Sequence, residues 1–135
     1  MNRGYALLDT DIVSFIFNKH TLAEKYAGHI ENSTPVISFI TPAEMFFGAY
    51  KKKWGESKIR NLDNFLRKYV IVGFKYEICQ EWGIIKAALE AKGKPASDTS
   101  NNDIGIAATA KVARIPLITH NKKDYEYIPG LEIIT

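Results

Sequence analysis

The chain has 135 residues, of which 46% are hydrophobic and 24% charged, and its formal net charge is +3. This length predicts one folded domain over residues 1–135, and the composition excludes a disordered chain. The charge is too small to identify a nucleic-acid-binding protein by itself, although it permits a polyanionic substrate.

Short, continuous apolar runs alternate with longer helix-like stretches along the chain. Such runs fit strands buried on both faces, and they predict strands at 5–8, 36–40, 69–72, 115–118 and 131–134. Helices are predicted at 10–17, 22–30, 43–54, 57–67, 76–91 and 103–113. Strands that alternate with helices imply crossover connections, so an α/β fold with a mostly parallel sheet is predicted.

The predicted helix at 43–54 follows Thr41 and Pro42, which we interpret as its cap and its first residue. This helix carries more aromatic side chains than one face toward a sheet requires, namely Phe46, Phe47, Tyr50 and Trp54. Either all of them belong to the core, or some form a surface for self-association or for a partner.

The chain contains one cysteine, Cys79, so no internal disulfide can form and a reducing compartment is expected. We expect Cys79 to be a small buried residue and not a catalytic thiol. The apolar run that leads into Asp9 has only four residues, 5–8, far short of the apolar region of a signal peptide or of a membrane span. A cytoplasmic protein without a membrane partner is predicted.

Three acidic residues stand where predicted strands and helices meet: Asp9, Glu44 and Asp103. Each has a local explanation as a helix cap, as part of a capping box, or as a favourable charge in a first turn. They also have a joint explanation, because the carboxyl ends of parallel strands and the following helix N-termini share one edge of a sheet. The three carboxylates could therefore meet in one crevice.

Carboxylates about 4 Å apart repel each other by about 4 kcal/mol at an effective dielectric constant near 20, so such a cluster raises pKa values or binds a cation. Oxygen ligands suit Mg²⁺ or Mn²⁺, whereas zinc would favour His or Cys, and no two of the three histidines stand at ligand spacing. His120 is expected in an exposed loop. No other catalytic motif is present, which leaves metal-activated water attacking phosphorus as the natural chemistry.

Five motifs follow one another along the chain: LLDTD at 7–11, SFITPAEMFFG at 38–48, NDIGIAATA at 102–110, ITHN at 118–121 followed by Asp124, and IPGL at 128–131. In this order and spacing the chain resembles the PIN-domain ribonucleases, in particular the VapC toxins of bacterial and archaeal toxin-antitoxin pairs.

The resemblance implies a three-layer α/β/α sandwich and an Mg²⁺- or Mn²⁺-dependent endoribonuclease whose core acids are Asp9, Glu44 and Asp103. Thr10 and Thr119 would support these acids or contact the substrate. The family often has a fourth acid after strand four, where this chain has Asn121, with Asp124 three residues later. We expect Asn121 to hold a water or a phosphate and Asp124 to be a further candidate metal ligand, so one ion and two ions both remain open.

The resemblance also implies a homodimer and a cognate antitoxin whose C-terminal segment crosses the acidic groove. Phe46, Phe47 and Tyr50 are candidates for the wall of that groove. Basic residues could hold the RNA backbone or could simply be solvated; they are Lys51, Lys52, Lys53, Lys58, Arg60, Arg67 and Lys68.

The sequence also allows two other functions. Residues 7–11 resemble the opening motif of haloacid-dehalogenase-like phosphatases, with Asp9 as nucleophile and Asp11 as acid, although the rest of that pattern is incomplete. Alternatively, the chain is a non-catalytic module that binds RNA or a protein, and its acids only cap helices. In the nuclease reading, Asp11 is either a support for the site or a favourable charge in the first helical turn.

Overall fold

Five short strands, all parallel, form the sheet of the computed structural model, which describes residues 4–135. They lie in the order β3-β2-β1-β4-β5. Their bounds are Tyr5–Leu8 for β1, Thr34–Ser38 for β2, Val70–Val72 for β3, Leu117–Ile118 for β4 and Ile133–Ile134 for β5. The chain leaves β1 toward β2 on one side and returns to β4 on the other, so the strand order switches beside β1.

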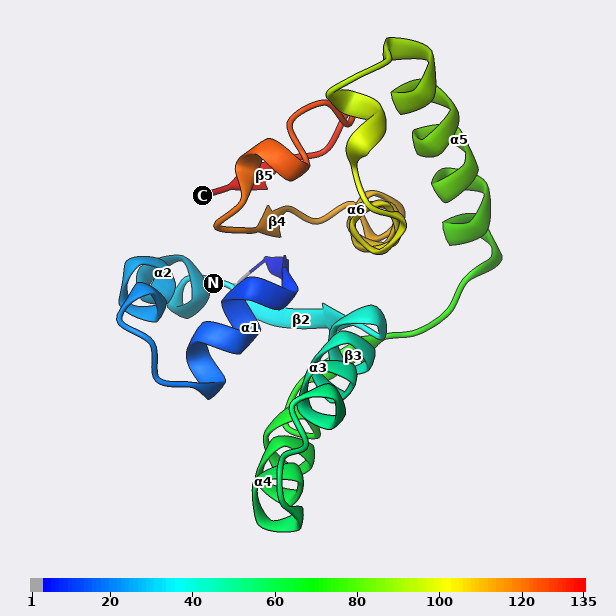
Figure 1. Ribbon diagram of the computed structural model, residues 1–135. Coiled ribbons are helices and arrows are strands. Elements are labelled where there is room, and N and C mark those ends of the chain that lie inside the picture. The colour runs from blue at the N-terminus through cyan, green and yellow to red at the C-terminus, as the bar shows by residue number, and fades with distance from the viewer. Residues whose placement is uncertain (1–3) are drawn as a thin grey trace.

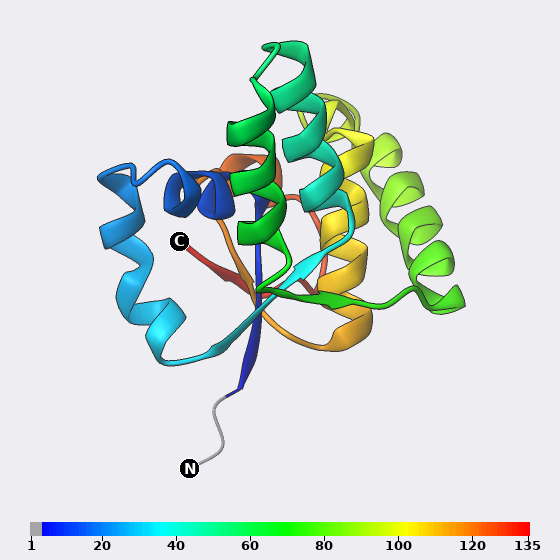
Figure 2. The ribbon, with the colours of Figure 1, turned by 90° about the horizontal axis from the view of Figure 1, so that it is seen from below.

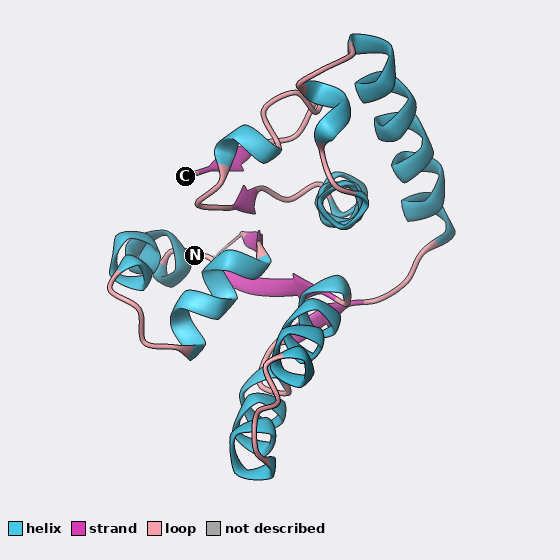
Figure 3. Cartoon of the chain, in the orientation of Figure 1, coloured by secondary structure: helices cyan, strands magenta, loops and turns pink. Residues whose placement is uncertain are grey.

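Six α-helices surround the sheet (Figures 1 and 3). They are α1 (Thr10–Phe17), α2 (Leu22–Glu31), α3 (Ile40–Lys51), α4 (Glu56–Leu66), α5 (Tyr76–Lys92) and α6 (Asn101–Ala113), with short 3-10 helices η1 (Ala96–Asp98) and η2 (Lys122–Asp124). None of the helices in residues 4–135 is long and apolar enough to cross a membrane.

Two hydrophobic cores lie on the two faces of the sheet. One contains α5, α6 and the segment after β4, and the other contains side chains of α1 to α4. Figure 2 shows α5 beside α6 and α3 beside α4. The predicted α/β/α sandwich is confirmed, and the predicted mostly parallel sheet is entirely parallel. Ala107, Ala108 and Ala110 of α6 are fully buried, which lets this helix approach the sheet closely.

The start of α3 differs from the prediction. The helix begins at Ile40, and Ser38 Oγ accepts a hydrogen bond from the Ile40 amide at 2.9 Å. Thr41 therefore lies inside the first turn, where it is fully buried and cannot cap the helix. Pro42 is tolerated there because the first amides of a helix have no partner in the helix. The predicted capping box at 41–44 is wrong, which leaves Glu44 without that structural role.

Three side chains or segments have a different environment from the one expected. β3 lies at the edge of the sheet, so Val70 is 64% exposed and not buried on both faces. Cys79 is exposed on α5. His120 is packed and not an exposed loop residue, because its Nδ1 lies 2.6 Å from the Tyr26 hydroxyl and its ring contacts the edge of Phe15.

Candidate active site

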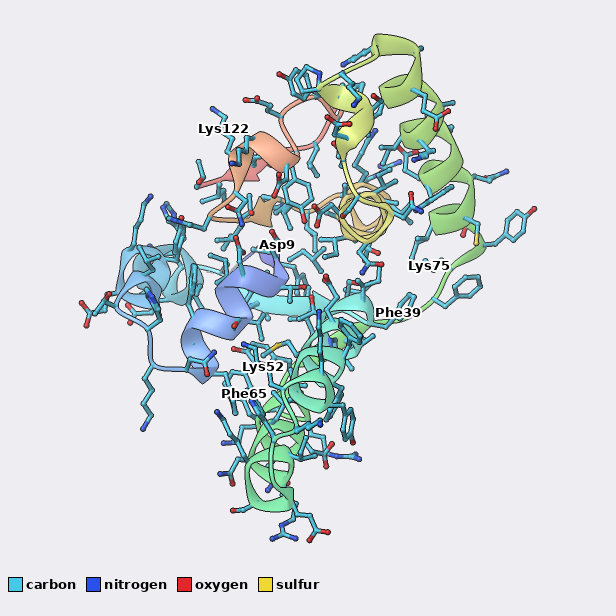
Figure 4. The ribbon with its side chains drawn as sticks, in the orientation of Figure 1. Asp9, Phe39, Lys52, Phe65, Lys75 and Lys122 are labelled. Atoms are coloured by element: carbon cyan, nitrogen blue, oxygen red, sulfur yellow. The ribbon has the colours of Figure 1, made fainter. Side chains whose placement is uncertain are left out.

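Asp9 lies at the carboxyl end of the central strand β1, where the strand order switches. Its backbone amide donates to the Ile118 carbonyl at 2.9 Å, which ties it to β4. Ligands of open parallel sheets bind outside the carboxyl ends of the strands at such a switch. The side chain is only 5% exposed and is the N-cap of α1. Figure 4 shows Asp9 at the top of α1, facing the segment after β4.

Three donors converge on the Asp9 carboxylate. Oδ1 accepts from the Thr10 amide and from the Tyr125 hydroxyl, both at 2.8 Å, and Oδ2 accepts from the Thr119 hydroxyl at 2.7 Å. Burial raises the pKa of Asp9 to about 7, the negative charge of Asp11 adds to this rise, and the two hydroxyl donors oppose it. Asp9 is therefore a desolvated acid whose negative charge is costly until a cation arrives.

Tyr125 joins Asp9 to Asp103. Its hydroxyl lies 2.8 Å from Asp9 Oδ1 and 3.1 Å from Asp103 Oδ1. Burial, and after it the charges of the two acids, hold the pKa of Tyr125 far above its ordinary value, so the hydroxyl keeps its proton. The Tyr125 hydroxyl has only one proton to donate. Either the two carboxylates share that hydrogen bond, or the hydroxyl donates to one carboxylate and accepts from the other acid in its protonated form. Sequence analysis missed this residue.

Asp103 stands in the first turn of α6, where Ser100 is the actual cap and accepts a hydrogen bond from the Asp103 amide at 3.1 Å. The Asp103 carboxylate is thus not needed to cap the helix. Burial raises its pKa, the hydrogen bonds from Tyr125 and Ser100 lower it, and the charges of Asp124 and Glu44 raise it again. The carboxylates of all four predicted acids therefore interact electrostatically around Asp103 or Asp9.

Glu44 is held by Thr10, whose hydroxyl donates to Glu44 Oε1 at 2.8 Å and lies 2.9 Å from the Thr41 hydroxyl. This contact links the start of α1 to the first turns of α3. The predicted supporting positions of Thr10 and Thr119 are both in direct contact with a predicted core acid. A second hydrogen bond holds the Thr119 side chain in place, because Thr119 Oγ1 accepts from the backbone N–H of Asn121 at 3.0 Å.

Asp11 organises the loop after β4. Its Oδ2 accepts from the His120 backbone amide at 3.1 Å and from the Asn121 side-chain amide at 2.9 Å, while Oδ1 accepts from the Ile12 amide at 2.7 Å. Asp11 is therefore a support of the loop that carries Thr119, and more than a charge in a first turn. The Asn121 side chain is engaged with Asp11, and its predicted contact with a water or phosphate stays a prediction.

Asp124, on η2, lies on the same side as Asp103. The two acids line one cleft of about 440 Å³, together with Lys123, Ser100 and Tyr127. Of the two candidates for the fourth acidic position, Asp124 is the one whose charge reaches Asp103.

The donor set fits a hard divalent cation. Every predicted ligand offers oxygen, and no ion pair formed by residues 4–135 involves Asp9, Glu44, Asp103 or Asp124. Uncompensated carboxylates in a partly buried crevice favour Mg²⁺ or Mn²⁺ over a protein cation. In the part of the chain that the structure describes, no three His, Cys, Asp or Glu side chains form a preassembled metal site. Glu44 is held on Thr10 while Asp9 and Asp103 are held on Tyr125, so joint metal binding by the three acids stays a prediction.

Replacing Tyr125 with phenylalanine tests its bridging role. The ring still fills the core, but Asp9 and Asp103 lose their shared donor, so we expect the free energy of unfolding to fall by about 1–3 kcal/mol. Denaturant unfolding measures this change. Tyr127→Phe is the matched control: within residues 4–135 the Tyr127 hydroxyl has no hydrogen-bond partner, and the Tyr127 backbone carbonyl accepts from Lys92. Equal stability of the two variants would refute the bridging role.

Known proteins resemble nearly the whole of this chain. The model of the PIN domain family matches residues 6–130. Ribonuclease VapC2 of Rickettsia felis is 34% identical over 93% of this chain and 92% of its own length. The crystal structure of Rickettsia felis VapBC2 bound to a promoter DNA fragment aligns with a TM-score of 0.81 and 31% identity, covering 96% of this chain and 97% of that one.

A second solved structure, VapBC-1 of nontypeable Haemophilus influenzae, aligns with a TM-score of 0.78 and 30% identity over 96% of each chain. These matches span nearly the whole chain, whereas the likeness to dehalogenase-like phosphatases rested on residues 7–11 alone. The chain belongs to the PIN-domain family and, within it, to the VapC ribonuclease toxins of toxin-antitoxin pairs.

Proposed function

We propose that this chain cleaves RNA phosphodiester bonds with the help of Mg²⁺ or Mn²⁺, at a site formed by Asp9, Glu44 and Asp103. One observation carries the proposal: Asp9 and Asp103, far apart in sequence, share the buried Tyr125 hydroxyl at the switch point of the sheet. A module whose acids only capped helices would not need such a bridge.

Each residue has a defined part in this site. Asp9, Asp103 and Glu44 would hold the ion, and Asp124 is the further candidate ligand. A bound divalent ion would supply Lewis-acid chemistry, by lowering the pKa of water and neutralising the phosphate. Thr119 and Tyr125 fix the Asp9 carboxylate, and Thr10 fixes that of Glu44. Asp11 holds the loop of Thr119 in place.

Metal dependence is the test of the proposed function. Cleavage of a structured RNA is expected to stop with a chelator, to return with Mg²⁺ or Mn²⁺, and to be absent in Asp103→Asn and Glu44→Gln. Glu90→Gln, an exposed acid on α5 paired with Lys86, is the control and should cleave normally. Cleavage that persists in chelator, or in both site variants, would contradict the proposal.

The proposed partners are a cognate antitoxin and a second copy of this chain. A pocket of about 350 Å³ combines the apolar side chains of Phe39, Ile40 and Phe47 with Glu44, which fits a basic, amphipathic peptide. Phe47 and Tyr50 are 66% and 64% exposed, whereas Phe46 packs partly into the core and stacks on Tyr50. Phe47 and Tyr50 are therefore better candidates than Phe46 for the wall of the groove that the antitoxin segment would cross.

A homodimer would cover a second exposed apolar region. Phe39 and Phe74, which are 58% and 72% exposed, line a pocket of about 470 Å³ with Ile78 and Trp82. Exposed apolar regions of this kind mark interaction surfaces. The proposed location of the protein is the cytoplasm, where an RNA substrate and an antitoxin are both available.

A further inference from the structure

Positive charge is concentrated on the hairpin formed by α3 and α4. Between residues 51 and 68 stand seven of the 18 basic residues of the chain and only two acidic ones, Glu56 and Asp63. The hairpin projects away from the sheet, as Figures 1 and 2 show. All seven basic side chains are exposed, namely Lys51, Lys52, Lys53, Lys58, Arg60, Arg67 and Lys68.

These charges are almost uncompensated. Among residues 4–135, only Arg67 of the seven is paired with a carboxylate, that of Asp63 at 3.1 Å. The dipole of α3 favours lysines at its C-terminus, where Lys51 and Lys52 stand. Lys58 and Arg60, however, stand near the N-terminus of α4, where the helix dipole disfavours a cation. Helix stability therefore explains only part of the pattern.

The basic hairpin is continuous with the acidic site. Lys52 lines a cleft of about 180 Å³ between α1 and α3, and Glu44 and Thr10 line the same cleft. Figure 4 labels Lys52, the C-cap residue of α3, between α3 and α1. Lys52 stands eight residues after Glu44, and eight residues span about 12 Å along a helix. The cation of Lys52 therefore lies a short distance from the carboxylate of Glu44.

Aromatic side chains accompany the cations at the tip of the hairpin. Tyr50, Trp54 and Arg60 line one open pocket, and Lys58 Nζ lies 3.8 Å from the centre of the Trp54 ring. Positively charged surfaces with exposed rings are typical of proteins that bind single-stranded nucleic acid, because phosphates contact the cations and bases stack on the rings.

We infer that the α3–α4 hairpin binds the sugar-phosphate backbone of the RNA substrate and leads the strand past Lys52 to Glu44. The inference rests on the proposed function, since it takes RNA as the substrate. Contacts of this kind position a strand without reading its sequence. The residues that carry the inference are Lys51, Lys52, Lys53, Lys58 and Arg60, with Tyr50 as the stacking surface.

Two charge-matched triple variants of the full chain test the inference. Lys51→Gln/Lys52→Gln/Lys53→Gln removes three charges from the hairpin, and Lys19→Gln/Lys75→Gln/Lys94→Gln removes three from other exposed sites. Both are made in the Asp103→Asn background, so that RNA binding is measured without cleavage. Circular dichroism and melting temperature verify that both variants are folded.

Fluorescence anisotropy with an unstructured RNA of about 20 nucleotides is the readout. The hairpin variant should bind about tenfold more weakly than its parent, and the slope of log affinity against log salt should become shallower by about 2, since each phosphate contact contributes about 0.7. The control variant should lose at most about twofold. Equal losses in both variants, or none, would overturn the inference.

Cleavage separates this inference from the proposed function. With wild-type Asp103, the hairpin variant should raise the KM for the long RNA and leave kcat unchanged. Unchanged RNA affinity with weakened binding of polyglutamate would assign the hairpin to an acidic polypeptide and overturn the inference. If no RNA is cleaved but hairpin-dependent RNA binding persists, the proposed function fails; the hairpin then binds RNA, but the inferred path of a substrate strand to Glu44 is overturned.

Discussion

Replacing Asp9 with asparagine is expected to lower RNA cleavage by about a thousandfold or more, because the side chain would no longer offer a charged ligand at the centre of the site. The fold should persist, since asparagine has nearly the same shape. Its side-chain oxygen can still accept from the Thr10 amide, as Asp9 Oδ1 does at 2.8 Å. The measurement is the initial rate of cleavage of a labelled RNA at saturating Mn²⁺.

Glu90→Gln serves again as the control for this experiment, because it removes one exposed carboxylate that is paired with Lys86 on α5 and contacts none of the site residues. A residual rate within about tenfold of the wild type would show that the Asp9 charge is not essential, and metal-dependent chemistry at this site would then be untenable.

The same substitution is expected to stabilise the metal-free protein at high pH. Burial raises the pKa of Asp9 from 3.8 to about 7, so the folded state binds this proton more tightly than the unfolded state. Relative to Asp9→Asn, the free energy of unfolding of the wild type therefore falls as the pH rises from about 4 to about 7. Above pH 7 the difference between the two proteins is constant. At about 1.4 kcal/mol per pH unit, the variant should be more stable by up to about 4 kcal/mol at pH 8.

Denaturant unfolding of both proteins in chelator, at several pH values from 4 to 8, measures this difference. Adding Mn²⁺ at about a hundred times its dissociation constant should return about 2.7 kcal/mol to the wild type and much less to the variant. A difference that is independent of pH, or that grows as the pH falls, would show that the Asp9 carboxyl is not desolvated in the folded protein.

The positions of the acids could be predicted because they depend on features that the sequence displays directly. Apolar runs indicate the strands, and the parallel order of strands and helices brings their carboxyl ends to one edge. Asp9 and Asp103 meet at the Tyr125 hydroxyl for this reason. Thr119, which the resemblance implied, lies with them because it directly follows β4, the neighbour of β1.

Other parts of the site depend on side-chain contacts that no periodicity reveals. In the sequence, Tyr125 looks like an ordinary aromatic residue of the core. Its function could have been suspected only because a buried tyrosine, unlike a phenylalanine, requires a hydrogen-bond partner for its hydroxyl. The role of Asp11 depends on a loop more than a hundred residues away in sequence. The start of α3 was missed because Ser38 satisfies the Ile40 amide, so the helix does not need Thr41 as its cap.

The exposure of β3 was missed for a topological reason. Its sequence, Val70-Ile71-Val72, is as apolar as that of a central strand, but only the order of the strands decides that it lies at the edge. The apolar pocket of Phe39 and Phe74 and the charged α3–α4 hairpin are the surfaces on which the proposed dimer and RNA contacts depend.

Anomalous diffraction from crystals soaked in Mn²⁺ tests the central claim most directly. The account predicts a strong peak in contact with carboxylate oxygens of both Asp9 and Asp103, at about 2.0–2.1 Å, the distance of oxygen ligands from a small divalent ion. Crystals of Asp9→Asn should lack this peak. An empty crevice in the wild type, with Mn²⁺ bound only at acids elsewhere such as Asp63, would contradict the account.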